Sequence, residues 1–396
     1  MDEIKNPYAP GAGIQPPELT GRDSFLSQAT ITVERALNGK FGKSFIATGL
    51  RGVGKTVLLN RVKNISTDRG CITSFIEIHE DKGLDTVIAP VFRKILLKLD
   101  NMGAISAAVK KGLRILVSFI KTIKLSYEGF ELGFDPEIGS ADSGDLELDL
   151  ADLFLAVGLA AKSRNTVVVL VLDEIQYLSN KEMSALVMAM HKSSQEELPL
   201  VLIGAGLPLL VGKMGESKSY AERLFAFPTV GALSYEDSAL AIDEPAKREG
   251  AGFDIEALKQ IYSLTHGYPY FLQEWAYVCW NISEGPIINA TDVANATPKV
   301  ISKLDESFFR VRFDRLTRRE KQYLRAMAEL GPGAHRSGDI AEMLRVAGHK
   351  LGPCRSGLIS KGMIYSPSYG DTAFTVPLFD QYMKRAMSFS PWNEVD

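Results

Sequence analysis

The stretch Gly49–Thr56, Gly-Leu-Arg-Gly-Val-Gly-Lys-Thr, has the residue types and spacing of a phosphate-binding loop. Its glycines let the backbone curl so that N–H groups face a phosphate, and the following helix start adds partial positive charge. Lys55 can reach the β- and γ-phosphates, and Thr56 can place its hydroxyl on Mg²⁺. We therefore predict ATP or ADP with Mg²⁺ as ligands. The predicted nucleotide-binding residues of this stretch are Gly49, Leu50, Arg51, Gly52, Val53, Gly54, Lys55, Thr56 and Val57.

Two adjacent acids, Asp173 and Glu174, directly follow the apolar run Thr166–Leu172. Beside a phosphate loop, Asp173 would hold Mg²⁺ through water, and Glu174 would polarise the water that attacks the γ-phosphate. Acids also end many strands in a solvated turn, so the pair alone is weak evidence. Together with Lys55 and Thr56, it predicts Mg²⁺-dependent ATP hydrolysis. Nucleotide binding without turnover remains the alternative.

Each of these two motifs needs a strand to bring it to the edge of a sheet. Lys43–Thr48 is typical of a short buried strand before the loop, and Val57–Val62 of an amphipathic helix after it. Further strands are predicted at Cys71–Glu80, Thr166–Leu172, Leu198–Ile203 and Phe225–Ala232, and helices at Leu84–Leu99, Leu146–Lys162 and Lys181–Gln195. Strands that alternate with helices predict an α/β fold, with helices on both faces of a parallel sheet.

The composition limits the class of protein. The chain has 396 residues, of which 45% are hydrophobic and 23% charged, as in a globular protein of two or three domains. Its cysteines, Cys71, Cys279 and Cys354, are too scattered to predict a disulfide framework or a metal site. No apolar run approaches the ~20 residues of a membrane span, and the N-terminus lacks a signal core. We predict a cytoplasmic protein without a membrane partner.

Two regions depart from the alternation of strands and helices. An insertion around 101–150 is first basic and then acidic, which favours a solvated face over a docking element. Within it, the alternation in Leu125–Phe134 predicts a hairpin. After Ser234, three successive amphipathic helices predict a small helical domain. These helices are Tyr235–Arg248, Ile255–Leu264 and Pro269–Ile282.

The last 96 residues carry an excess of positive charge. Residues 301–396 hold 15 Lys and Arg against 11 Asp and Glu, whereas the whole chain has a net charge of −3. Thr317–Glu320 is a capping box that opens a helix, and further helices are predicted at Ser337–Val346 and from Pro353 to before Gly362. Short strands then bracket the turn Ser366–Thr372. This order resembles a winged helix, and the predicted DNA contacts are Arg318, Arg319, Lys321, Arg355 and Lys361.

Over nearly its whole length the chain resembles AAA+ ATPases of the origin-recognition-like and STAND-related group. Gly49–Thr56 is similar to their Walker A motif, Leu170–Glu174 to their Walker B motif, and His266–Leu272 to the Gly-x-Pro motif that opens a lid helix. The resemblance implies that Gly21 and Arg22 pack near the adenine and that Tyr268 and Pro269 approach the nucleotide from the lid.

The resemblance also implies an arginine finger and leaves two sensors in doubt. Arg223 stands where such a finger reaches the nucleotide of a neighbouring subunit, in a homo-oligomer, although it is equally placed to be a surface residue. The first sensor, a side chain at the end of the fourth strand that detects the γ-phosphate, is often polar in these proteins. Here Gly204–Gly206 occupies its position. The lid motif offers no arginine for the second sensor.

These observations predict three domains: a nucleotide-binding α/β domain at 1–233, a helical lid at 234–300 and a winged helix at 301–396. The favoured function is an ATPase switch that couples nucleotide state to the binding of double-stranded DNA. The alternative is a STAND-type signalling or defence ATPase whose winged helix binds a protein partner. A nucleotide-binding scaffold with negligible turnover is the third possibility.

Overall fold

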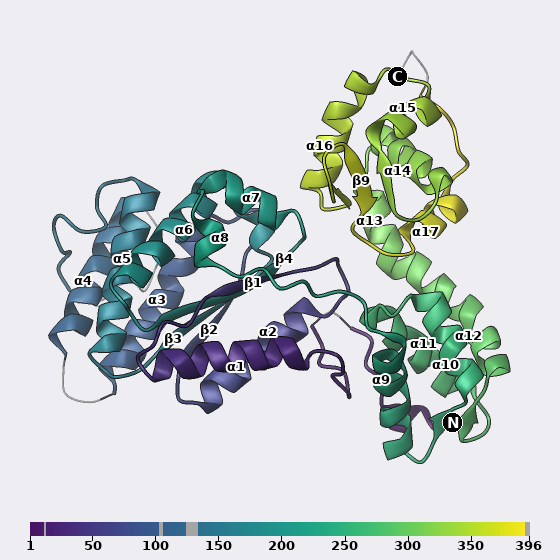
Figure 1. Ribbon diagram of the computed structural model, residues 1–396, viewed down its shortest axis with the longest axis horizontal. Coiled ribbons are helices and arrows are strands. Elements are labelled where there is room, and N and C mark those ends of the chain that lie inside the picture. The colour runs from purple at the N-terminus through teal and green to yellow at the C-terminus, as the bar shows by residue number, and fades with distance from the viewer. Residues whose placement is uncertain (12, 103–105, 124–133, 393–396) are drawn as a thin grey trace. The chain divides into compact units, whose positions relative to one another are not determined.

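The chain folds into two compact units (Figure 1). The computed structural model describes residues 1–11, 13–102, 106–123 and 134–392. Unit 1 contains Met1–Gly21, Leu50–Gly54 and the chain from Gly231 onward, and unit 2 contains Arg22–Gly49 and Lys55–Val230. A separate hydrophobic core lies in each unit. Within the described residues, no helix combines the length and the apolar character that crossing a membrane requires.

Unit 2 is built on a parallel sheet with the strand order β1-β4-β3-β2. Its strands are β1 (Phe45–Thr48), β2 (Ile72–Glu77), β3 (Val168–Asp173) and β4 (Leu200–Gly206). Every residue of β3 and β4 is buried, as expected for strands that are covered on both faces. The register pairs Thr48 with Gly206 and Glu77 with Asp173. The carboxyl ends of the strands therefore meet at one edge of the sheet.

Helices cover both faces of this sheet. The helices of unit 2 are α1 (Asp23–Leu37), α2 (Lys55–Asp68), α3 (Leu84–Asp100), α4 (Ala107–Thr122), α5 (Leu146–Lys162), α6 (Asn180–Gln195), α7 (Leu210–Ser217) and α8 (Ala221–Leu224). In Figure 1, α1 and α2 lie along one side of the sheet, and α3, α5 and α6 along the other. Helix α4, from the predicted insertion, packs on α3 and α5 rather than on the strands. The α/β fold with a parallel sheet is thus confirmed.

The predicted strand at Phe225–Ala232 does not form a continuous strand. Ala226 and Thr229 make only isolated parallel bridges, to Phe45 and Thr48 of β1. Pro228 lies between them and lacks the N–H that a continuous ladder would need, so the segment pairs only in part at the sheet edge. The hairpin predicted at 125–134 lies almost wholly outside the described residues.

The helical part of unit 1 follows the sequence prediction closely. Its elements are α9 (Tyr235–Arg248), β5 (Gly252–Phe253), α10 (Ile255–Thr265), α11 (Pro269–Ile282), β6 (Ile287–Ile288) and α12 (Ala290–Lys303). Helix α12 continues into a π-helical stretch, Leu304–Phe309, whose phenylalanine rings pack on Phe271 of α11. These rings join the helical part and the C-terminal part in one core.

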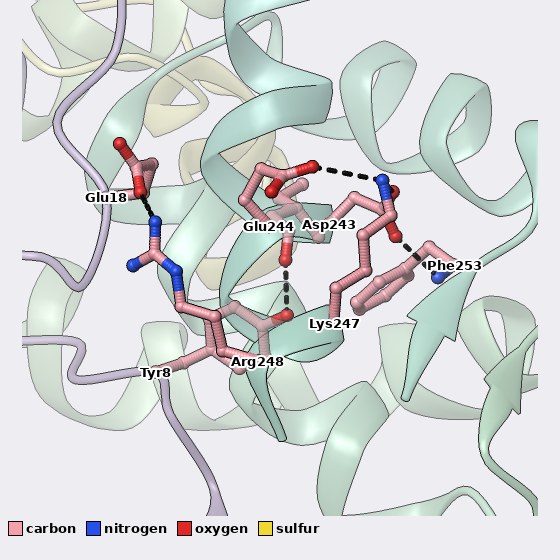
Figure 2. Close-up of polar contacts among 8 residues, drawn as sticks. Tyr8, Glu18, Asp243, Glu244, Lys247, Arg248 and Phe253 are labelled. Atoms are coloured by element: carbon pink, nitrogen blue, oxygen red, sulfur yellow. Dashed lines mark hydrogen bonds and ion pairs between the residues drawn. The ribbon is translucent and has the colours of Figure 1, made fainter. Parts of the chain in front are cut away.

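The proline-rich N-terminal segment is held against α9. Figure 2 shows Tyr8 donating its hydroxyl hydrogen to the Ile242 carbonyl and Arg248 paired with Glu18. Tyr8 is buried, at 3% exposure, and packs edge-on against the rings of Phe253 and Trp280. The segment is therefore an integral part of the helical core of unit 1.

The C-terminal part of unit 1 places helices around a small antiparallel sheet with the order β7-β9-β8. Its elements are α13 (Arg310–Asp314), α14 (Arg318–Leu330), β7 (Ala334–Arg336), α15 (Ser337–Leu344), a 3-10 turn (Gly348–Leu351), α16 (Gly352–Ser360), β8 (Ile364–Tyr365), β9 (Asp371–Phe374) and α17 (Phe379–Ala386). Thr317 and Glu320 form the predicted capping box at the start of α14. The turn that was expected to be a wing connects β8 and β9.

Candidate nucleotide-binding site

The predicted phosphate loop joins β1 to α2. Gly52 and Gly54 have φ angles of 83° and 90°, in the left-handed region that favours glycine. The Gly49 N–H donates to the Gly206 carbonyl at 3.1 Å, which ties the start of the loop to the end of β4. Lys55 opens α2, and its buried ammonium group donates to the Gly49 carbonyl at 2.9 Å. The ammonium group of Lys55 therefore lies at the base of the loop.

Thr56 and Asp173 meet at the same edge of the sheet. The Thr56 hydroxyl donates to Asp173 Oδ2 at 2.6 Å, and the Glu174 N–H donates to Oδ1 at 2.8 Å. Asp173 is only 2% exposed. Burial raises the pKa of this carboxyl group above its ordinary value, an effect that the Thr56 hydrogen bond opposes and the neighbouring Glu174 charge reinforces. Two segments 117 positions apart therefore form one polar site.

The residues present fit a Mg²⁺ ion that is shared with a nucleotide. Mg²⁺ is usually held by one or two carboxylates together with waters and substrate phosphates. The Thr56 hydroxyl and the Asp173 carboxylate supply such oxygens side by side. Among the residues that the structure describes, no group of three or more His, Cys, Asp and Glu side chains could hold a metal. Thr56 and Asp173 would hold Mg²⁺ together with a nucleotide's phosphates.

Glu174 follows directly after β3 with a left-handed backbone, at φ 56°. Its carboxylate accepts a hydrogen bond from the side-chain amide of Gln176, which lies in the 3-10 turn Ile175–Tyr177. Sequence reasoning did not select Gln176. The signal that could have found it is the run of small residues at the end of β4, Gly204–Gly206, where a polar side chain was expected.

The other predicted nucleotide contacts are distributed over both units. In unit 1, Gly21 has a left-handed backbone, and a Cβ there would lie 2.5 Å from Asp237 Oδ2. In unit 2, Arg22 is the buried N-cap residue of α1. Tyr268 caps α11 and Pro269 is its first residue. Contact of these four residues with a nucleotide stays a prediction.

Within unit 1, the phosphate loop contacts the C-terminal segments through its backbone. The Tyr270 N–H, at the start of α11, donates to the Gly52 carbonyl at 3.3 Å. The Arg51 N–H donates to the Thr375 carbonyl, also at 3.3 Å. Val53 is buried, at 1% exposure. The Arg51 N–H, which the sequence assigned to a phosphate, therefore already has a protein acceptor.

Arg223 lies on the short helix α8 in unit 2, and its side chain is exposed. Exposure is compatible with an arginine finger that reaches a second subunit and equally with an ordinary surface residue. Its assignment as a catalytic residue stays a prediction.

The five residues predicted to contact DNA differ in exposure and in the contacts that their charged groups make within the protein. Arg355 donates to Thr372 Oγ1 and to the Asp371 carbonyl, both at 3.0 Å, and so braces the turn between β8 and β9. Lys361 pairs with Glu320 at 2.6 Å. The remaining three lie on α14: Lys321 is half-buried, with its ammonium group over the Phe313 ring, and Arg318 and Arg319 are exposed, with the Arg319 guanidinium over the Trp392 ring.

Replacing Asp173 with asparagine is expected to stabilise the nucleotide-free protein while removing ATP hydrolysis. Asparagine can accept from the Glu174 N–H through its oxygen and donate from its NH2 group to the Thr56 hydroxyl oxygen, and it carries no buried charge. Because the folded state raises the pKa of Asp173 above 3.8, wild-type stability falls as pH rises from 3.8 through that higher pKa. The melting temperature of the variant should therefore exceed that of wild type by a few degrees at neutral pH, and the difference should shrink toward pH 4.

Thermal melts across this pH range, with Asp81→Asn at an exposed position as the matched control, test this expectation. A variant that melts below wild type at neutral pH would contradict it.

Comparison with known proteins agrees with this geometry. The family model described as "AAA domain" matches residues 41–209, and a "Domain of unknown function (DUF8462)" matches residues 306–383. A search of the curated proteins found no match. Among solved structures, the chain is similar to the Walker-type ATPase PABY2304 of Pyrococcus abyssi, with a TM-score of 0.58 and 16% identity over 93% of this chain and 97% of that one.

Two further solved structures are similar at lower TM-scores. The Aeropyrum pernix ORC1 protein in complex with DNA has a TM-score of 0.45 and 15% identity, over 93% of each chain. The Thermotoga maritima RuvB Holliday junction branch migration motor has a TM-score of 0.43 and 14% identity, over 92% of this chain and 95% of that one. With the parallel sheet, the phosphate loop and the match at residues 41–209, the chain has the AAA+ P-loop NTPase fold.

Proposed function

We propose that this protein is an AAA+ ATPase switch that binds ATP with Mg²⁺, hydrolyses it and couples its nucleotide state to a macromolecular partner. The observation that carries the proposal is the 2.6 Å bond between Thr56 and Asp173, with Lys55 and Glu174 adjoining them in sequence. Four side-chain types that phosphoryl transfer requires thus come together at one sheet edge.

Each residue has a distinct role in this proposal. Lys55 leaves the Gly49 carbonyl to pair with the phosphates, which neutralises their charge. Bound Mg²⁺ would neutralise the developing charge on the same phosphates, with Thr56 and Asp173 holding it. Glu174 accepts the proton of the attacking water. A steady-state phosphate-release assay tests the proposal, and a protein that binds ATP without turnover would reduce it to a nucleotide-binding scaffold.

The partner that we propose is double-stranded DNA, bound through a winged helix in the C-terminal part of unit 1. Support comes from the order of helices α14, α15 and α16 and strands β7, β8 and β9, with the turn at 366–372 in the position of a wing. The excess of Lys and Arg in residues 301–396 favours an anionic partner. A protein partner, as in a signalling ATPase, is the competing candidate.

DNA binding is expected to weaken steeply as salt rises, because Lys and Arg contacts with phosphates release counterions. Replacing the exposed pair Arg318 and Arg319 with alanine should weaken binding and reduce the slope of log K against log salt by about 1 to 2. Lys361→Ala and Arg355→Ala should also weaken binding, and each additionally removes a contact within the protein, to Glu320 and Thr372 respectively.

Fluorescence anisotropy of a labelled duplex at several salt concentrations, with and without ATP, provides the measurement. The matched control removes two exposed lysines, Lys247 and Lys259, from α9 and α10 of the same unit. If the wild-type protein binds no duplex at low salt, with or without ATP, the DNA proposal fails. A protein partner is then the remaining candidate.

A further inference from the structure

The end of β4 lacks the polar side chain that the sequence comparison led us to expect there. Gly204 pairs with Leu172 of β3, so the Gly204–Gly206 run adjoins the catalytic edge of the sheet. A Cβ on Gly204 would lie 2.3 Å from Ile175 Cδ1, and one on Gly206 would lie 2.6 Å from Gln176 Oε1. Because these two glycines have no side chains, the side chains of Ile175 and Gln176 can pack against the end of β4.

The side chain of Gln176 lies at this end of β4 and links two strands of the sheet. Its amide nitrogen donates to Glu174 Oε2, and its amide oxygen accepts from the Leu207 N–H at 3.0 Å, just after β4. A carboxylate only accepts and a backbone N–H only donates, so a single orientation of the amide satisfies both partners. Gln176 is 9% exposed, so water competes little for these bonds.

The backbone of the turn at 174–178 makes its own hydrogen bonds, in addition to those of the Gln176 side chain. Lys213 of α7 donates to the Gln176 carbonyl at 3.1 Å and also to the Leu178 carbonyl. The left-handed backbone of Glu174 is held by the bond from its N–H to Asp173. Strand β3, the turn and α7 therefore support one defined position of the Gln176 amide.

We propose that Gln176 is the positioning residue for Glu174. An amide has no proton to exchange with a carboxylate near neutral pH, so it can orient Glu174 without competing for the proton of the attacking water. Through Leu207 it also ties that orientation to the strand beside the phosphate loop. The inference rests on the proposed ATP hydrolysis.

Gln176→Ala is expected to lower kcat by about 10- to 100-fold, because a misplaced general base loses most of its contribution. ATP affinity, measured with a fluorescent ATP analogue, should stay within about twofold of wild type, since Lys55 and the loop are untouched. Gln195→Ala, which makes the same chemical change at the exposed end of α6, is the matched control. In the double variant with Glu174→Gln, the Gln176 change should add no further loss of kcat.

Gln176→Glu tests the same contact with a side chain of nearly the same shape, so it does not create the cavity that alanine leaves. Leu207 can still donate to the new carboxylate, but this group faces Glu174 as a like charge. Asp173 adds negative charge nearby, and Lys55 and Lys213 supply the positive charges. The repulsion should displace the Glu174 carboxylate, so kcat should fall at least as far as in Gln176→Ala while ATP affinity stays within about twofold of wild type, a split that a purely structural role would not produce.

Gly206→Ala approaches the contact from the other side, because the added Cβ would lie 2.2 Å from Leu210 Cδ1 and 2.6 Å from Gln176 Oε1, so both side chains must move. It should reproduce the kcat defect, whereas Gly212→Ala, at an open position on α7, should not.

A wild-type kcat in Gln176→Ala would overturn the inference, and so would a parallel loss of ATP affinity and kcat, which would make Gln176 a general structural residue. If Gln176→Ala fails to fold in a thermal melt, a wild-type kcat in Gln176→Glu overturns it instead. Wild-type protein that binds ATP but releases no phosphate would remove the proposed hydrolysis itself, and with it this role. That outcome is recognised before any variant is compared.

Discussion

Lys55→Ala is expected to abolish ATP binding, with the dissociation constant raised about 100-fold or more, because the phosphates lose their principal charge-assisted hydrogen bond. In the structure the Lys55 ammonium group is held by the Gly49 carbonyl at 2.9 Å, at the base of the loop. Its replacement therefore removes the ligand contact and leaves both strands that frame the site unchanged. Isothermal titration calorimetry with ATP and Mg²⁺ measures the effect.

Lys63→Ala is the matched control, since it removes a lysine two turns further along the same helix, α2. It should bind ATP as wild type does. Retention of wild-type affinity in Lys55→Ala would show that the loop does not hold the phosphates of the nucleotide.

The second large effect is expected from Glu174→Gln, which should bind ATP normally but lower kcat by about 100-fold or more, the contribution of a general base. Glutamine keeps the shape of the side chain and can still meet the Gln176 amide, but it cannot accept the proton of the attacking water. The loss should therefore fall on kcat and not on the affinity for ATP. A phosphate-release assay at saturating ATP measures it.

Glu196→Gln, at the exposed end of α6, makes the same change away from the site and should leave turnover unaltered. If Glu174→Gln hydrolyses ATP at the wild-type rate, Glu174 is not the general base and the positioning role of Gln176 also fails.

Local sequence patterns were sufficient to predict the parts of the fold whose constraints lie within a few residues. The phosphate loop needs glycines at particular positions of one turn, and Gly52 and Gly54 adopt the required left-handed backbone. Helices α5, α9 and α11 have the predicted bounds, because capping residues and apolar periodicity mark helix ends in the chain itself. At Phe225–Ala232, apolar character suggested a strand, but Pro228 limits the pairing.

Contacts between distant segments were decided only by the tertiary structure. Arg355 and Lys361 were predicted to contact DNA, which stays a prediction, and packing also brings them to Thr372 and Glu320, 17 and 41 positions away. The bond from Arg51 to Thr375 likewise joins segments that the sequence places in different domains. Long side chains find partners according to the fold around them, which a linear pattern does not encode.

The candidate nucleotide-binding site shows the same difference between sequence and tertiary structure most clearly. The sequence by itself determined that Lys55, Thr56, Asp173 and Glu174 are present in the order that phosphoryl transfer needs, since each motif is a run of consecutive residues. Only the tertiary structure revealed that β4 lies between β1 and β3, so that glycines at its end face the turn after Glu174. The role of Gln176 follows from that neighbourhood, because the spacing of strands in a sheet depends on long-range packing and not on their order in the chain.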